Sequence, residues 1–302
     1  MAVFAGTSGD LVADRRLAYA EALAQEGDLP AAIEVLAGAL DRVPGWAAGW
    51  FRLGEWHQAA GDTAAAVAAW DSALAADPAD ALGAGLKRDL ARAGAQAAAM
   101  PSAFVETLFD QYADRFDTAL VDRLDYRAPA LLAAALDTAH PGRRFARVMD
   151  LGCGTGLMGA AIRGRADHLA GIDISAAMLA QAQAKRLYDR LEKGDLAALA
   201  PAPGQHDLIL AADVFAYLGR LEPILTWCAE ALVPGGVLGF SVESQDDAPL
   251  VLRESRRFAH SRAYLDAALR AAGLGVLAMQ PAVLRKDRGE DIHGLIVLAA
   301  AP

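Results

Sequence analysis

Apolar residues follow two different patterns along this chain, with a change near residue 100. In residues 11–95 the pattern recurs at a separation of 34 residues, which pairs Ala32 with Ala66 and Pro44 with Pro78. A fixed period of this length is typical of stacked helical hairpins. From residue 148 onward, short apolar runs alternate with helical segments, which is the pattern of a parallel sheet with crossover helices. The chain is therefore predicted to hold a helical domain followed by an α/β domain.

Domain boundaries follow from these patterns and from the turn-forming residues between them. We expect a loosely ordered N-terminus over residues 1–10, a repeat domain over 11–95, a linker over 96–103 and an α/β domain over 104–302. Ser102 is expected to cap a helix that begins at residue 103. Beyond the first strand, strands are expected over residues 168–173, 187–192, 207–212, 237–242, 274–284 and 292–298, and helices over 157–164 and 261–272.

A glycine-rich run follows the first expected strand of the α/β domain. Residues 150–156 read D-L-G-C-G-T-G. Glycine lets the backbone turn tightly and bring its N–H groups to a ligand, while the following helix offers its N-terminus to negative charge. The dinucleotide motif G-x-G-x-x-G is not met, because Leu157 stands where its third glycine would be. No Gly-Lys-Ser/Thr follows, so the run is not a P-loop either.

An acid and two further turns complete the pattern around this glycine loop. Asp173 ends the second expected strand, 21 residues after Gly152, where a carboxylate can accept from both hydroxyls of a ribose. Dinucleotide-binding folds use an acid at the same position, so it does not identify the cofactor alone. Together with Gly194-Asp195 and the Leu-x-Pro-Gly-Gly run at 232–236, the G-x-G-x-G loop resembles the class I S-adenosylmethionine-dependent methyltransferases.

This resemblance implies S-adenosyl-L-methionine as the cofactor and S-adenosyl-L-homocysteine as its product. The acid of the second strand would hold the ribose, the two apolar residues after it would pack on the adenine, and the Asp-Leu pair after the third strand would bind the adenine edge. Segment 104–117 resembles a lid helix, with an aromatic residue placed near the sulfonium. The implied cofactor-binding residues are Tyr112, Asp150, Gly152, Cys153, Gly154, Gly156, Asp173, Ile174, Met178, Asp195, Leu196 and Asp213, with Phe116 as a second lid candidate.

The helical repeats resemble a second family, because 34 residues is the tetratricopeptide (TPR) period. Gly27-Asp28 recurs as Gly61-Asp62, and a third helix over residues 79–93 is expected to cap the stack. The second copy matches that family at Trp50, Leu53, Gly54, Gly61, Ala66, Trp70, Ala73 and Pro78.

Taken whole, the chain resembles the bacterial group of predicted methyltransferases that carry N-terminal TPR repeats. Segments 109–117, 126–129 and 257–261 support the resemblance to this group. The resemblance implies all-α TPR hairpins followed by a Rossmann-like α/β class I methyltransferase domain. Its sheet is expected to have seven mostly parallel strands and an antiparallel closing strand.

The chemical step needs few residues in this class of enzyme. Methyl transfer from a sulfonium is an in-line displacement with a good leaving group, so positioning can supply most of the rate, and a general base adds about 10²–10⁴-fold. Candidates for a base or an acceptor anchor are Asp213, Tyr217 and Glu243, which are expected beyond the carboxyl ends of strands.

A polar cluster over residues 256–264 supplies two more catalytic candidates, His260 and Tyr264. Histidine titrates near neutrality, and the arginines of the cluster can hold a carboxylate or a phosphate. The alternative is a solvated turn in which Ser261 caps a helix. Segment 285–291 is expected to be an exposed hairpin tip.

The charge and the cysteine content of the chain indicate which classes of ligand and partner are not expected. The net charge of −10 divides into −6 over residues 1–100 and −4 over the remainder, so neither half has the basic surface that nucleic acids require. Cys153 and Cys228 are far apart in sequence, and neither a disulfide framework nor a metal site is expected. The first residues show neither a signal peptide nor a membrane span, so a cytoplasmic location and no membrane contact are expected.

Three functions remain open on the sequence. The favoured one is methyl transfer to an oxygen or nitrogen of an unidentified small molecule, with the repeats structural or forming a homodimer. The second is a protein methyltransferase whose repeat groove recruits the substrate protein, because repeat arrays offer concave binding faces. The third is an adaptor that binds S-adenosylmethionine without catalysis.

Overall fold

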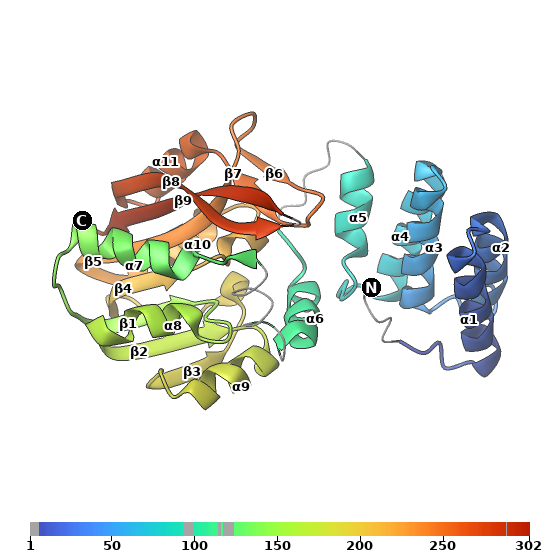
Figure 1. Ribbon diagram of the computed structural model, residues 1–302, viewed down its shortest axis with the longest axis horizontal. Helices are drawn as coiled ribbons and strands as arrows, with labels where there is room; N and C mark the ends of the chain where they lie inside the picture. The colour runs from blue at the N-terminus through green and yellow to red at the C-terminus, as the bar shows by residue number, and fades with distance from the viewer. Residues whose placement is uncertain (1–5, 93–98, 114–115, 117–123, 288) are drawn as a thin grey trace. The chain divides into compact units, whose positions relative to one another are not determined.

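The computed structural model describes residues 6–92, 99–113, 116, 124–287 and 289–302. It divides into two compact units, Met1–Ala97 and Ala98–Pro302 (Figure 1). The first unit is helical, and the second is built on a mixed sheet with helices on both faces. Across the described part of the chain, no helix is both long enough and apolar enough to cross a bilayer.

The helical unit is a series of antiparallel hairpins. Helix α1 packs against α2, α3 against α4, and α5 against α4. These helices span Leu11–Gln25 (α1), Leu29–Leu40 (α2), Ala47–Ala59 (α3), Thr63–Ala76 (α4) and Ala84–Ala91 (α5). The fold therefore contains the predicted helical hairpins.

The turns inside the two hairpins explain the 34-residue period. Gly27 and Gly61 both have positive φ, at 90° and 84°, and each ends the first helix of its hairpin. The next residue in each copy, Asp28 or Asp62, caps the second helix by accepting a hydrogen bond from a backbone N–H at 3.1 and 3.0 Å respectively. In each copy, a glycine that ends one helix is thus followed directly by an aspartate that caps the next helix.

The third helix begins later than expected. The sequence predicted a helix over residues 79–93, but α5 starts at Ala84 because Asp80 takes a left-handed conformation with φ of 55°. The buried carboxylate of Asp80 accepts from the backbone N–H groups of Ala84 and Gly85, at 2.6 and 3.0 Å. These bonds fix the turn between Pro78 and the helix.

The second unit contains nine described strands in one sheet. Their order is β3-β2-β1-β4-β5-β7-β6, and β9 pairs with both β5 and β8. The strands span Phe145–Leu151 (β1), Ala166–Asp173 (β2), Arg190–Lys193 (β3), His206–Ala211 (β4), Leu232–Ser244 (β5), Leu250–Leu252 (β6), Phe258–His260 (β7), Gly275–Asp287 (β8) and Glu290–Ala300 (β9). Strands β1 to β5 are parallel to one another, and β8 and β9 form the predicted closing antiparallel hairpin.

Two short strands, β6 and β7, were not predicted. They form an antiparallel pair, and β7 runs parallel to the last two residues of β5, with Glu243 opposite Ala259 and Ser244 opposite His260. Strand β5 extends beyond β4, whose last pair joins Ala211 to Phe240, so the end of β5 has room for this partner. The extension brings residues 253–260 to the carboxyl edge of the sheet.

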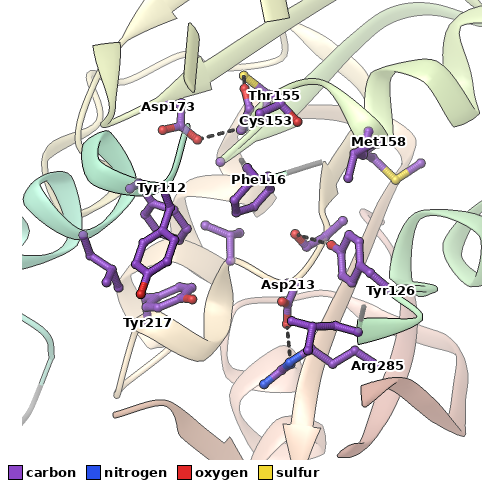
Figure 2. A pocket seen from close by; sticks show the side chains of 18 of the residues that line it. Tyr112, Phe116, Tyr126, Cys153, Thr155, Met158, Asp173, Asp213, Tyr217 and Arg285 are labelled. Atoms are coloured by element: carbon purple, nitrogen blue, oxygen red, sulfur yellow. Dashed lines mark hydrogen bonds and ion pairs between the residues drawn. The ribbon is translucent and has the colours of Figure 1, made fainter. Parts of the chain in front are cut away.

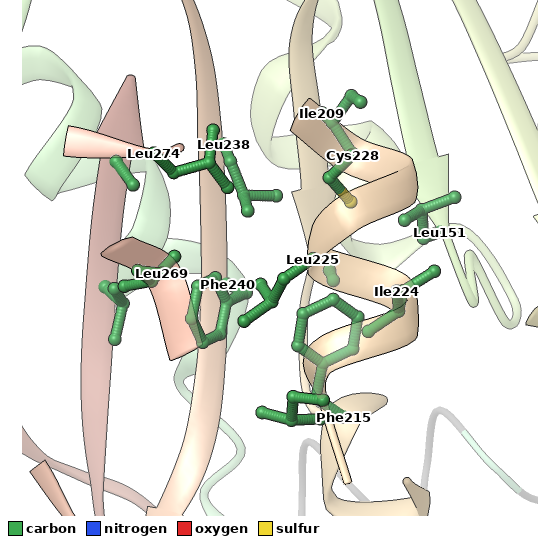
Figure 3. Packing of buried hydrophobic residues seen from close by; sticks show 14 of the residues in the cluster. Leu151, Ile209, Phe215, Ile224, Leu225, Cys228, Leu238, Phe240, Leu269 and Leu274 are labelled. Atoms are coloured by element: carbon green, nitrogen blue, oxygen red, sulfur yellow. The ribbon is translucent and has the colours of Figure 1, made fainter. Parts of the chain in front are cut away.

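Helices cover both faces at the centre of the sheet, so the middle of β4, residues 208–211, is apolar and buried at consecutive positions. In β4, Leu208 and Leu210 join a core with α7 and α8, while Ile209 joins the opposite core with α10 and α11. Figure 3 shows Leu225 and Cys228 of α10 packed toward β4 and β5. The helices span Ser102–Tyr112 (α6), Ala128–Ala139 (α7), Leu157–Ile162 (α8), Ala176–Lys185 (α9), Glu222–Ala231 (α10) and Arg262–Ala271 (α11).

The start of α6 corrects a second expectation. Ser102 is not the N-cap, because the helix begins at Ser102 itself and Pro101 precedes it as the cap residue. The hydroxyl of Ser102 instead donates to a carboxylate oxygen of Asp195 at 2.5 Å, which joins α6 to the turn after β3.

Close contact between α3 and α4 yields a test of the helical unit. A Cβ at Gly54 would lie 2.4 Å from the indole nitrogen of Trp70, which is fully buried. Gly54→Ala should therefore lower the free energy of unfolding by about 1–3 kcal/mol, measured by urea titration. Gly45→Ala, where no atom lies within 4 Å of the new Cβ, should stay within about 0.5 kcal/mol. Equal stability of both variants would contradict the close packing of these helices.

Candidate active site

The glycine loop joins β1 to α8 in a conformation that side chains rarely allow. Gly152, Gly154 and Gly156 have φ of 64°, 53° and 94°. A Cβ at Gly152 would lie 2.3 Å from a methyl carbon of Val214, in the segment after β4. Absence of a side chain at this position therefore lets the loop and the segment after β4 meet at one edge of the sheet.

Asp173 orders the glycine loop from the end of β2. One carboxylate oxygen accepts from the N–H of Gly154 at 2.8 Å, and the other accepts from the N–H of Ser175 at 2.8 Å. The side chain is buried, and burial raises its pKa above the ordinary value despite these bonds. Asp173 keeps lone pairs beyond these two bonds, as a ribose-binding carboxylate requires.

Asp150 lies behind the loop rather than in the pocket. It is fully buried, and the hydroxyl of Tyr188 donates to its Oδ2 at 2.6 Å, while Oδ1 has no described partner. Burial raises its pKa to about 7. The ring of Tyr188 also lies where a side chain at Gly159 or Gly171 would be, so it supports the loop from behind. No sequence motif indicated Tyr188.

A pocket of about 280 Å³ opens in front of the glycine loop (Figure 2). Its walls come from α6, the residues before α7, the glycine loop and the start of α8, the end of β2, the segment after β4, and two arginines, one directly before β7 and one in β8. The described lining residues are Leu108, Phe109, Tyr112, Phe116, Leu124, Tyr126, Gly152, Cys153, Gly154, Thr155, Leu157, Met158, Asp173, Ala212, Asp213, Val214, Tyr217, Arg257 and Arg285. Burial raises the pKa of the Cys153 thiol, so this cysteine stays protonated.

Helix α6 covers one side of the pocket with aromatic rings. Tyr112 of this helix lines the pocket, as does Phe116 beyond the end of the helix, and Phe109 packs edge-on against Tyr217 with ring centres 5.2 Å apart. Asp110 fixes the helix to the cofactor loops by accepting from the hydroxyl of Ser175 at 2.6 Å. The remaining residues of the expected lid segment, 114–115 and 117, lie outside the described residues.

Charged side chains gather at the end of the pocket that lies away from the glycine loop. Asp213 has a left-handed backbone with φ of 60°, held by a bond from its N–H to the Ser241 hydroxyl at 2.9 Å. Its carboxylate accepts from Arg257 and, at 3.3 Å, from Arg285. Arg257 also donates to the hydroxyl of Tyr217, whose pKa burial raises. Tyr217 is therefore a neutral hydroxyl in this cluster.

Glu243 lies beneath this cluster at the end of β5 and is 1% exposed. Its Oε1 accepts from Arg257 and Arg285, each at 2.6 Å, and its Oε2 accepts from Arg253 at 3.0 Å. Burial alone would raise its pKa, but the guanidinium groups of Arg257 and Arg285 outweigh burial and lower it. Glu243 is thus ionised and holds three arginines together.

Arg285 overturns part of the expectation for segment 285–291. It is 5% exposed and lines the pocket, because β8 continues to Asp287 and Arg285 follows the buried Leu284 within the strand. The exposed tip begins beyond it, at Lys286. An arginine directly after an apolar strand was a signal in the sequence that could have identified this residue.

His260 and Tyr264 are not among the described lining residues of the pocket. His260 is fully buried, its Nε2 lies 2.8 Å from the carbonyl oxygen of Gly219, and burial lowers its pKa. Its ring stacks on Tyr264, whose hydroxyl accepts from the N–H of Leu221 and donates to Glu222, both at 2.8 Å. This geometry gives the two residues a supporting role for the segment after β4. Ser261 caps α11, as the alternative interpretation of this cluster predicted.

Several implied cofactor residues also lie outside the pocket lining. Gly156 precedes α8 as its N-cap residue, Met178 is fully buried in α9, and Ile174 is half-buried. Asp195 accepts from Ser102 and from the N–H of Ala197, at 2.5 and 2.8 Å, and Leu196 starts the short turn that follows. The structure thus gathers the glycine loop, Asp173, Tyr112 and Asp213, whereas the adenine-binding set remains a prediction.

Within the described residues, no group of three or more His, Cys, Asp or Glu side chains could hold a metal ion.

Comparisons with known proteins identify both parts of the chain. Residues 148–236 match the family model of the methyltransferase domain, and residues 13–56 match that of the tetratricopeptide repeat. A malonyl-[acyl-carrier protein] O-methyltransferase of Enterobacter lignolyticus is 34% identical over 117 residues, which is 39% of this chain and 47% of that protein. A trans-aconitate 2-methyltransferase of Deinococcus radiodurans is 38% identical over 118 residues, 38% of this chain and 45% of that protein. The chain spans about half the length of these curated relatives.

A solved structure supports the fold. It is a putative methyltransferase of Haloferax volcanii, in a complex with the Trm112 methyltransferase activator, with a TM-score of 0.52, 24% identity, and coverage of 64% of this chain and 97% of that one. The predicted order along the chain is confirmed: a segment that matches the tetratricopeptide repeat precedes one that matches the methyltransferase domain family. Proteins of this family use S-adenosylmethionine as their methyl donor, as predicted.

The buried Asp150 yields a test by pH. Its pKa is about 7 in the folded protein against 3.8 as the ordinary value, so the folded state binds this proton more tightly than the unfolded chain. Stability contributed by this proton is lost as the pH rises from about 4 to about 7. The side chain of the Asp150→Asn variant does not titrate. Between pH 5 and pH 8 the free energy of unfolding of this variant should therefore fall by about 1–3 kcal/mol less than that of the wild type, measured by urea titration at each pH. An identical change in both proteins would contradict the raised pKa.

Proposed function

We propose that this protein is an S-adenosylmethionine-dependent methyltransferase that acts on an oxygen or nitrogen of a small acceptor. One observation carries the proposal: a single pocket joins the glycine loop and Asp173 to a second polar group that contains Asp213, Tyr217 and two arginines. A methyltransferase needs such a pocket, because the methyl donor and the acceptor must meet in line.

The residues at the glycine-loop end fit an adenosyl cofactor. The left-handed glycines keep the loop free of side chains, and a Cβ at Gly154 would meet only one atom, 4.0 Å away on Phe116. Asp173 would accept from the ribose hydroxyls, and Tyr112 and Phe116 would face the positive sulfonium, a contact worth on the order of 1–2 kcal/mol when desolvated. The cofactor supplies an electrophilic methyl group there.

The other end of the pocket supports a small acceptor. Tyr217 and Asp213 are both bound to Arg257, so their side chains are held in place to orient an acceptor. Phe109 of helix α6 packs edge-on against Tyr217 and gives this end an apolar wall beside the polar groups. The relatives named above act on malonyl-[acyl-carrier protein] and trans-aconitate, and both names denote carboxylic acids.

All described residues that line the pocket belong to the unit Ala98–Pro302. We therefore assign the chemistry to this unit and give the helical repeats no part in the chemical step. The reaction rests on positioning, which in well-aligned reactants is worth effective molarities of about 10⁵–10⁸ M.

Asp173 tests the cofactor site. Asp173→Ala should weaken S-adenosylhomocysteine binding at least about tenfold in calorimetry, because it removes the ribose contacts and the bond that orders Gly154. Asp167→Ala is the matched control, since Asp167 lies in the same strand with an exposed side chain bound to Arg144 at 2.7 Å. It should change the affinity by less than about twofold. Unchanged affinity of the Asp173 variant would remove the ribose site from this strand.

Transfer of a labelled methyl group tests the reaction itself. The full chain is incubated with methyl-labelled S-adenosylmethionine and bacterial extract, which is then separated into small molecules and proteins. We expect label in a small-molecule product, and a loss of at least about tenfold with Asp173→Ala. Label confined to the protein fraction would favour a protein methyltransferase. Tight cofactor binding without label in either fraction would favour an adaptor without catalysis.

A further inference from the structure

We infer that Arg257 and Arg285 form an anchor for a carboxylate group of the acceptor, at the end of the pocket away from the glycine loop. This inference rests on the proposed function, because it names the chemical class that this methyltransferase would take. It assigns a binding role to the charged cluster, beyond holding the fold together.

Both arginines reach the pocket from outside the strands that hold the glycine loop. Arg257 directly precedes β7, and Arg285 lies near the end of β8. Their side chains are 11% and 7% exposed, and both line the same pocket as Asp213 and Tyr217. Figure 2 shows Arg285 and Asp213 at the side of the pocket away from Asp173, with Phe116 between the two ends.

Charge balance at this end favours an anion. Asp213 and Glu243 carry two negative charges, and they bind three guanidinium groups, those of Arg253, Arg257 and Arg285. One positive charge is left over among these described side chains, and Tyr217 stays neutral because burial raises its pKa. The two buried guanidinium groups balance the two carboxylates, and the surplus charge comes from Arg253, whose side chain is 34% exposed. The resulting positive field favours an anion over a neutral or cationic group at this end of the pocket.

The guanidinium groups keep donors for such an anion. Arginine has five N–H donors in a planar fork, and Arg285 uses one at Nη1 and one at Nη2 for its described acceptors. Arg257 uses one donor each at Nε, Nη1 and Nη2, and its guanidinium lies 4.7 Å over the ring of Tyr217. Both forks are therefore fixed in orientation before a ligand arrives, which reduces the entropic cost of binding.

The size of the excess charge indicates a carboxylate rather than a phosphate monoester. A carboxylate brings one negative charge, whereas a phosphate monoester carries about −1.5 to −2 at neutral pH. Two adjacent guanidinium forks also match the two oxygens of a carboxylate.

The anchored carboxylate is not the group that receives the methyl. Methylation of a carboxylate oxygen removes its negative charge, so arginines bound to that group would stabilise the ground state more than the transition state. We therefore place the reacting atom elsewhere on the acceptor, closer to the glycine loop. The acceptor would then carry one carboxylate for Arg257 and Arg285 and a second nucleophilic group for the methyl.

Calorimetry on the full chain saturated with S-adenosylhomocysteine tests this assignment. The probes are a panel of small dicarboxylic and hydroxycarboxylic acids, each compared with its neutral methyl ester or amide, and phosphate monoesters of similar size. At least one acid should bind at least about tenfold more tightly than its neutral counterpart and than the phosphate monoesters. Arg257→Lys and Arg285→Lys should each weaken that acid at least about tenfold, because an ammonium cannot reproduce the fork.

Arg253→Lys is the matched control. Arg253 binds the same Glu243 carboxylate but is not among the described lining residues, and its side chain is 34% exposed. It should change acid affinity by less than about twofold. S-adenosylhomocysteine affinity, measured for every variant, reports on folding of the cofactor site. If one pocket variant fails to fold, the other variant and the comparison of acid with ester still decide the question.

The possible results separate the inference from the proposed function. Failure of the wild type to bind S-adenosylhomocysteine contradicts both. Three results would contradict the carboxylate anchor while leaving the proposed function intact, provided that the cofactor binds. They are equal affinity for acids and esters, tighter binding of phosphate monoesters than of acids, and no binding of any acid. The carboxylate anchor is also contradicted if Arg257→Lys and Arg285→Lys both bind the acid as tightly as the wild type does, or if Arg253→Lys weakens acid binding as much as they do.

Discussion

The close approach of Gly152 to Val214 is the constraint on which the site depends. The loop after β1 and the segment after β4 come from neighbouring parallel strands, and a Cβ at Gly152 would lie 2.3 Å from a Val214 methyl carbon. Without a side chain there, the two segments meet, and Asp213 stands one residue from that contact. A cofactor loop and an acceptor-binding segment are thereby joined in one pocket.

Buried carboxylate and guanidinium groups line or support the opposite end of this pocket. Glu243 and Asp213 would be costly to bury alone, and their bonds to Arg257 and Arg285 compensate that cost. The insertion of β6 and β7 brings Arg257 into position, while the closing hairpin brings Arg285. The same ion pairs thus maintain the carboxyl edge of the sheet and orient two guanidinium groups toward the pocket.

The sequence was most informative where backbone geometry alone determines the structure. The glycine loop, the acid that ends β2 and the turns of the repeat follow local rules, and the structure brings the loop and Asp173 together at 2.8 Å. Tyr188 and Arg285 were not identified, because their roles depend on contacts with residues 38 and 42 positions away in the chain. His260 was a catalytic candidate because of its residue type, and its burial in the short strand β7, outside the described pocket lining, could not be read from residue type alone.

A crystal structure of the complex with S-adenosylhomocysteine would test the central claim most directly. The account predicts ribose hydroxyls within about 3.2 Å of the Asp173 carboxylate, and a sulfur atom that faces the end of the pocket containing Asp213, Tyr217 and the two arginines. A ligand bound away from the glycine loop, or a sulfur atom directed away from that charged end, would contradict it.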